Sequence, residues 1–83
     1  INSNSELAYF NRGNTKGSLK DYDGAIADYS KTIEINPNNG SAYKNRGIAK
    51  ELIGDLKGAC ADWRRASDMG LKKTDLWILT QCY

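Results

Sequence analysis

The sequence matches itself when it is shifted by 34 residues, and this internal repeat limits what the chain can fold into more than any other feature. Residues 6–39 align without a gap onto residues 40–73, and Tyr29 meets a second aromatic residue, Trp63. Eleven positions are identical in the two units: Ala8/Ala42, Tyr9/Tyr43, Asn11/Asn45, Arg12/Arg46, Gly13/Gly47, Lys16/Lys50, Asp21/Asp55, Gly24/Gly58, Ala25/Ala59, Ala27/Ala61 and Asp28/Asp62. We therefore expect two copies of one structural unit, stacked on each other.

Each unit is predicted to be a pair of helices joined by a short turn. In the first unit, Leu7, Phe10 and Asn14 fall on one face of a helix. Asp21 offers a carboxylate that can cap a second helix starting directly after it. The polar segment 36–40 contains a proline and ends that helix.

The second unit repeats this plan and is followed by one more helix. Asp55 caps the second helix of this unit, Gly70 closes it, and Thr74 or Asp75 caps a last helix that runs through residue 83. The prediction is an all-α chain of five helices without strands. We expect a single domain of residues 1–83, divided into repeat 1 (6–39), repeat 2 (40–73) and a capping helix (74–83).

Small residues at fixed positions indicate how the two helices of a unit pack. Helices can approach closely only where a side chain is nearly absent, and Gly13 and Gly47 provide such notches. Because aromatic residues recur together with these small ones, we interpret the aromatic residues as core rather than as a ligand cage. The residues expected to form the packing are Tyr9, Gly13, Ala25, Tyr29, Tyr43, Gly47, Ala59 and Trp63.

The spacing of these residues resembles that of the tetratricopeptide repeat (TPR) family. The motif is Tyr9-x-x-Arg12-Gly13-x-x-Lys16, Ala25-x-x-x-Tyr29 and Pro37 in the first unit, and Tyr43-x-x-Arg46-Gly47-x-x-Lys50 and Ala59-x-x-x-Trp63-x-x-Ala66 in the second. The resemblance implies a right-handed α-solenoid and a protein–protein interaction module. It also implies that a peptide or protein segment binds the concave face, which the first helix of each repeat lines. The Asn-Arg-Gly and Ala-Asp steps resemble a bacterial subgroup of the family.

Arginine stands at positions 12 and 46, where the family usually has leucine, so each arginine needs a partner if it is buried. Each unit supplies an aspartate at the same offset, Asp28 for Arg12 and Asp62 for Arg46. Arginine suits bidentate contacts with a carboxylate. We predict that each pair bridges the two helices of its own hairpin, and the alternative is that the arginines bind an anionic ligand.

Composition excludes several classes of function. Lysine and arginine number 12 against 10 acidic residues, which is too balanced for an electrostatic nucleic-acid binder, and no apolar run is long enough to span a membrane. Without any histidine, neither Cys60 nor Cys82 has the usual base to activate it, so we expect no enzyme, no metal and no cofactor. Two cysteines without a zinc spacing indicate reduced thiols in an intracellular protein, in the bacterial cytoplasm.

The inner face of the predicted hairpins holds the candidate binding residues. Asparagine amides can bind the backbone of a peptide, and apolar and lysine side chains can add contacts. This predicted groove consists of Phe10, Asn11, Asn14, Lys44, Asn45 and Ile48. Asn14 and Asn45 stand where the family's clamp for acidic C-termini has asparagines. Because Phe10 replaces a lysine there, and Asp75 and Leu79 replace basic residues, we do not expect that clamp.

The partner itself is an unidentified protein or peptide, and the alternative is a self-associating scaffold. Two repeats are fewer than the three that such arrays usually need. The last helix also carries the apolar run Leu76-Trp77-Ile78-Leu79. We expect Leu76, Leu79 and Trp77 to seal the array, with Ile78 partly exposed, and a homodimer could form through this helix or through swapped repeats.

Overall fold

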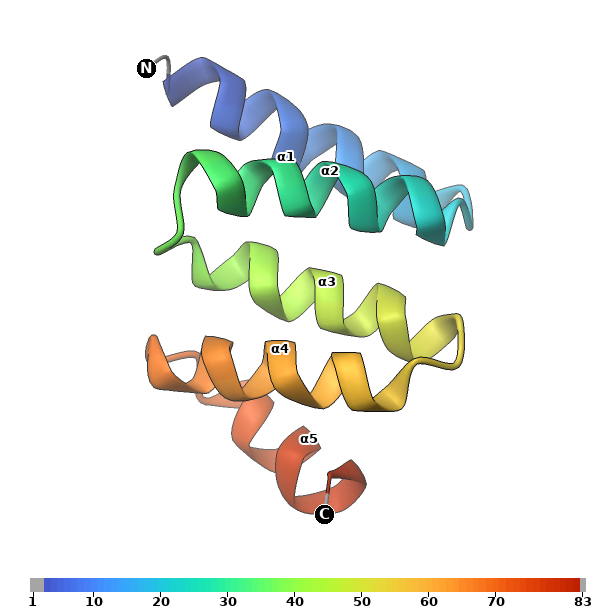
Figure 1. Cartoon of the computed structure of the whole chain (residues 1–83), viewed down its shortest axis with the longest axis vertical. Helices are drawn as coiled ribbons and strands as arrows, with labels where there is room; N and C mark the ends of the chain where they lie inside the picture. Colours follow the sequence, from blue (N-terminus) through green and yellow to red (C-terminus); the bar gives the residue numbers. More distant parts are fainter. Residues whose placement is uncertain (1–2, 83) are drawn as a thin grey trace.

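The computed structural model describes residues 3–82, and these residues form five α-helices. The helices are α1 (Ser3–Ser18), α2 (Tyr22–Ile35), α3 (Gly40–Leu52), α4 (Leu56–Asp68) and α5 (Lys73–Gln81). Each helix packs mainly on its neighbours in the chain. The first four run back and forth, so the α1–α2 and α3–α4 turns lie at the same edge, and α5 lies beyond α4 (Figure 1). The predicted all-α chain of five helices is confirmed.

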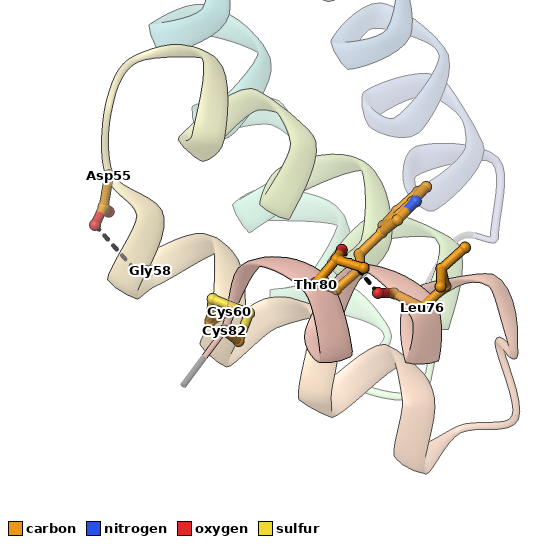
Figure 2. Close-up of a disulfide and its surroundings, with 7 residues drawn as sticks. Asp55, Gly58, Cys60, Leu76, Thr80 and Cys82 are labelled. Atoms are coloured by element: carbon orange, nitrogen blue, oxygen red, sulfur yellow. Dashed lines mark hydrogen bonds between the residues drawn. A yellow bond between two sulfur atoms is a disulfide. The ribbon is translucent and has the colours of Figure 1, made fainter.

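Side-chain caps fix where α2, α3 and α4 begin. Asp21 accepts a hydrogen bond of 3.0 Å from the backbone N–H of Gly24, and Asp55 accepts one of 2.9 Å from Gly58 (Figure 2). Asn39 caps α3 and also donates to the Glu6 carboxylate at 3.0 Å. The α2–α3 turn is thereby tied to the first turns of α1.

The predicted cap of the last helix was wrong. Helix α5 begins at Lys73, one residue before the expected cap, and Lys72 precedes it without a side-chain capping bond. Thr74 is fully buried inside the first turn, where its hydroxyl donates to the Leu71 carbonyl at 2.6 Å. The threonine hydroxyl therefore donates to a carbonyl of the preceding loop and does not cap the first N–H groups of α5.

Two glycine notches receive the aromatic side chains of the following helix. A methyl group added at Gly13 would lie 2.8 Å from the Tyr29 ring, and one added at Gly47 would lie 2.5 Å from Trp63 Nε1. Tyr29 and Trp63 are buried, together with Ala25 in the first hairpin and Ala59 in the second. The remaining two predicted packing residues, Tyr9 and Tyr43, are only half-buried.

Replacing Gly47 with alanine should therefore destabilise the fold. The added methyl would also lie 3.2 Å from the Ala59 carbonyl oxygen, so backbone and indole would both have to shift. Overpacking costs roughly 1–3 kcal/mol and the gain in helix propensity is about 1 kcal/mol, so we expect a net loss of about 1 kcal/mol. Gly17→Ala is the matched control, because its methyl would meet nothing within 4 Å and should stabilise α1. Urea unfolding that gave both variants the same sign would contradict this.

Helix α5 rests on α4 through one stripe of its surface. Thr74 and Cys82 are buried, and Trp77, Ile78 and Gln81 are half-buried. Leu76 and Leu79 lie on the other side, 62% and 77% exposed, so the expectation that they seal the array was wrong. The buried residues follow the spacing i, i+3, i+4, i+7, i+8 of an amphipathic helix, which the two leucines do not share.

Cys60 in α4 and Cys82 at the end of α5 form a disulfide bond (Figure 2). The expectation of two reduced thiols was therefore wrong. It rested on the usual chemistry of a compartment and not on geometry, whereas the packing of α5 brings the two Cα atoms to 5.8 Å, well within disulfide range. No helix within residues 3–82 is both long and apolar enough to cross a membrane.

Candidate functional site

Each hairpin contains an arginine–aspartate pair between its two helices. Arg12 donates from Nε and Nη2 to the two carboxylate oxygens of Asp28, both at 2.8 Å. Arg46 makes the same two contacts with Asp62, again at 2.8 Å. The structure thus brings together both predicted pairs in bidentate geometry, and these side chains join α1 to α2 and α3 to α4.

A lysine completes each cluster, which the sequence interpretation missed. Lys16 Nζ lies 3.3 Å from Asp28, and Lys50 Nζ lies 3.1 Å from Asp62. Their identical offset from the aspartate in both units was the signal that could have revealed them. Each buried aspartate therefore faces two cations.

The two clusters differ in how far they are buried. The Arg46 side chain is 18% exposed and also donates to the Ser30 hydroxyl in the preceding repeat at 3.1 Å. The Arg12 side chain is 59% exposed, so the condition of burial holds for Arg46 and not for Arg12. No helix precedes α1 within the described residues to cover Arg12, whereas α2 covers Arg46. Each guanidinium also lies 5.5 Å above a tyrosine ring of its own helix, Tyr9 or Tyr43.

The cluster of Asp28 with Arg12 and Lys16 should make the folded state less stable in acid. The hydrogen bond from Arg12 is the main cause that lowers the pKa of Asp28, burial opposes it, and Lys16 lowers it further. A carboxyl whose pKa is lower in the folded state stabilises the fold above its unfolded value of about 4, and this contribution disappears as the pH falls through the lowered value. Thermal unfolding between pH 5 and about pH 2 should show it. In Asp28→Asn this part of the slope should be missing, and equal slopes in both proteins would contradict the assignment.

A hollow of about 350 Å³ lies between α1, α2 and α3. We call it the α1–α3 hollow. It combines amide, hydroxyl and apolar groups, and it opens to solvent. Its lining residues are Asn14, Gly17, Ser18, Tyr22, Ala25, Tyr29, Asn45, Ile48, Ala49 and Leu52.

A hydrogen-bonded network of three side chains forms one wall of this hollow. The Tyr29 hydroxyl donates to Asn14 Oδ1 at 2.5 Å, and Asn45 Nδ2 donates to the same oxygen at 3.1 Å. Burial raises the pKa of Tyr29, so its hydroxyl stays protonated and keeps donating at neutral pH. The Asn14 oxygen is used twice, while its own N–H groups have no partner among residues 3–82. These N–H groups remain available to an acceptor.

The structure gathers only part of the predicted groove. Asn14, Asn45 and Ile48 line the α1–α3 hollow, whereas Phe10, Asn11 and Lys44 do not. Phe10 instead packs against Tyr29, with the ring centroids 5.8 Å apart, and Asn11 is exposed. The sequence interpretation missed the contribution of the second helix, Tyr22, Ala25 and Tyr29, and of Leu52. The reason is that it assigned the concave face to first helices alone.

The fold and these contacts define the class of protein: a helical repeat domain built from stacked hairpins of equal length. Residues 7–39, which include most of the α1–α2 hairpin, match the family model described as Tetratricopeptide repeat. The α3–α4 hairpin follows it in the same register. Such domains generally serve as protein–protein interaction modules and are typically not catalytic. A comparison with curated proteins found no match.

Proposed function

We propose that this chain is a non-catalytic interaction module that binds an extended peptide segment of another protein in the α1–α3 hollow. The observation that carries the proposal is the composition of the hollow wall. The N–H groups of Asn14 can pair with peptide carbonyls, while Ile48 and Leu52 can contact an apolar side chain. Among residues 3–82, no lysine or arginine lines the hollow, which favours a neutral segment over an acidic tail. We also propose that residues 1–83 form a single domain, divided into repeat 1 (6–39), repeat 2 (40–73) and a capping helix (74–83).

Two exposed leucines allow a matched test. Leu52 lines the hollow and is 55% exposed, whereas Leu19 is 75% exposed and does not line it. We would select binders from a random peptide library on the oxidised domain and measure their affinity by calorimetry. Leu52→Glu should weaken binding about tenfold or more, since a charge would enter the apolar part of the site. Leu19→Glu should leave the affinity unchanged. Equal effects of both variants would contradict a site in the hollow.

Self-association through α5 is a second candidate, because Leu76 and Leu79 present an apolar face without cover among residues 3–82. A weak homodimer should appear in sedimentation velocity as the protein concentration rises. Leu79→Glu should abolish it, and Leu7→Glu, at the far end of the array, should not. A monomer at all concentrations would exclude this candidate.

The disulfide also bears on where the domain works. The expected bacterial cytoplasm rested on reduced thiols, and the Cys60–Cys82 bond removes that support. We propose a compartment in which disulfides persist. Alkylation of free thiols at the moment of cell lysis should leave both cysteines unmodified. We also place the chain in the bacterial subgroup named above, since its characteristic arginine and aspartate are paired in both hairpins.

A further inference from the structure

The Cys60–Cys82 bond holds α5, a helix without a side-chain N-cap. At its first turn, α5 contacts the preceding hairpin through a hydrogen bond from the Ser67 hydroxyl to the Asp75 carboxylate. In the middle, Trp77 and Ile78 pack beside Trp63. Its C-terminal end is fixed by Cys82. The disulfide is therefore the covalent part of a short, otherwise weakly held helix.

A second hollow, of about 300 Å³, lies directly beside this bond. We call it the disulfide hollow. Both cysteines are largely buried, but both line this hollow. A reagent in the hollow therefore lies next to the disulfide bond. The other lining residues are Leu56, Lys57, Arg64 and Gln81. Lys57 and Arg64 are both exposed, and none of the lining residues within 3–82 carries a carboxylate.

Asp55, which caps α4, does not neutralise these two cations. Asp55 stands at the start of α4 and is not part of the lining of the disulfide hollow. Its carboxylate accepts the backbone N–H of Gly58 (Figure 2). Lys57 and Arg64 also have no ion-pair partner among residues 3–82. Their charge is thus free to act on a molecule in the hollow.

We propose that the disulfide hollow is a thiol–disulfide exchange site that takes a small anionic thiol. The carboxylates or sulfonate of such a thiol would pair with Lys57 and Arg64, which raises its local concentration next to the bond. The thiolate attacks one sulfur, forms a mixed disulfide with that cysteine and releases the other as a thiolate. A second thiol then attacks the mixed disulfide. In total two thiols become one small disulfide, and their two protons end on Cys60 and Cys82.

Reduction has a structural consequence that is confined to one end of the molecule. Without the bond, α5 keeps the packing of Trp77 and Ile78 and the contact of Asp75, but its C-terminal end is released. We expect α5 to open more often and to expose Trp63 intermittently. No disulfide joins α1 to α2 or α3 to α4 within residues 3–82, so the packing inside these two hairpins should not respond.

The test compares 2-mercaptoethanesulfonate with cysteamine, a thiol of opposite charge, on the folded oxidised protein. Reduction rates are followed by alkylation and mass spectrometry and are expressed per thiolate. The anionic thiol should react faster, and Lys57→Glu with Arg64→Glu should lower the ratio of anionic to cationic rates about tenfold at low salt. The control is Lys20→Glu with Lys31→Glu, which changes the net charge equally but at exposed sites away from the hollow. The ratio of the control should stay within about twofold of the parent value, and salt should reduce the difference between the variants.

Three results would overturn the proposal. The first is an equal drop of the ratio in both double variants, which would assign the effect to net charge. The second is an unchanged ratio in Lys57→Glu with Arg64→Glu. The third is a bond that is reduced only when the whole protein unfolds, as judged by hydrogen exchange. Exchange that rises in 74–82 after reduction, and not in α1 or α3, is the expected structural result.

Discussion

Replacing Asp62 with alanine is expected to lower the free energy of unfolding by about 3 kcal/mol, because it leaves a largely buried arginine without its partner. Asp62 is buried and faces both Arg46 and Lys50, whose side chains are 18% and 20% exposed. The Ser30 hydroxyl would be the remaining partner of the guanidinium. Chemical unfolding followed by far-UV circular dichroism measures the loss.

The internal repeat provides the control for this substitution. Asp28→Ala removes the same contacts in the first hairpin, but the Arg12 side chain is already 59% exposed and can be hydrated instead. We therefore expect a clearly smaller loss than for Asp62→Ala. Asp62→Asn, which keeps the volume but not the charge, should fall between the parent and Asp62→Ala. If Asp28→Ala costs as much as Asp62→Ala, burial does not control the strength of these pairs.

Replacing Trp63 with alanine is expected to cost about 3–5 kcal/mol, the range for truncating a buried large aromatic side chain. Trp63 is 1% exposed and fills the Gly47 notch on one side. On the other side its ring lies 5.3 Å from that of Trp77, centroid to centroid. The substitution thus opens a cavity in the contact with α3 and in the contact with α5.

Trp77→Ala is the matched comparison, measured by urea unfolding of the oxidised protein. Only part of this side chain is removed from water on folding, so we expect a loss of about 1–2 kcal/mol. The disulfide remains in both variants and keeps α5 attached, which limits both effects. A larger loss for Trp77→Ala than for Trp63→Ala would show that the α4–α5 contact, rather than the α3–α4 contact, dominates the core.

The fold and the ion pairs could be predicted because both follow from the period of the sequence. A residue and its copy 34 positions later occupy equivalent places in the two repeats. A pair such as Arg12–Asp28 therefore occurs a second time, as Arg46–Asp62. The turns before α2 and α4 could be predicted from single residues, because Asp21 and Asp55 are the expected N-caps of these helices. The period does not predict how exposed a side chain is. Arg12 and Arg46 occupy equivalent positions in the two repeats, but their side chains are exposed to different extents.

The disulfide could have been found from the same period. Cys60 aligns with Ile26 of the first unit, and Cys82 aligns with Ile48 of the second. The two isoleucines lie on consecutive helices, α2 and α3, just as the cysteines lie at α4 and at the end of α5. The usual redox state of a compartment carries no information on which side chains lie near each other. Position within the repeat was the stronger signal, because it concerns which side chains can meet.

The run Leu76–Leu79 shows a limit of patterns in short helices. Four consecutive apolar residues surround a helix on all sides, so the run alone does not indicate which of them are buried. The choice is made by Thr74 and Cys82, which are buried at the two ends of α5 and set its rotation. Hydrophobicity alone therefore assigned the two leucines to the wrong face.

The stripe of α5 that faces α4 includes Gln81, which stands where Gly13 and Gly47 stand in the earlier units. In those units the glycine admits an aromatic ring from the next helix, and a glutamine side chain would fill that space. The notch that receives the aromatic ring in the first two hairpins is therefore absent from α5. An engineer who wished to dock a copy of these hairpins on α5 would restore glycine at position 81 first.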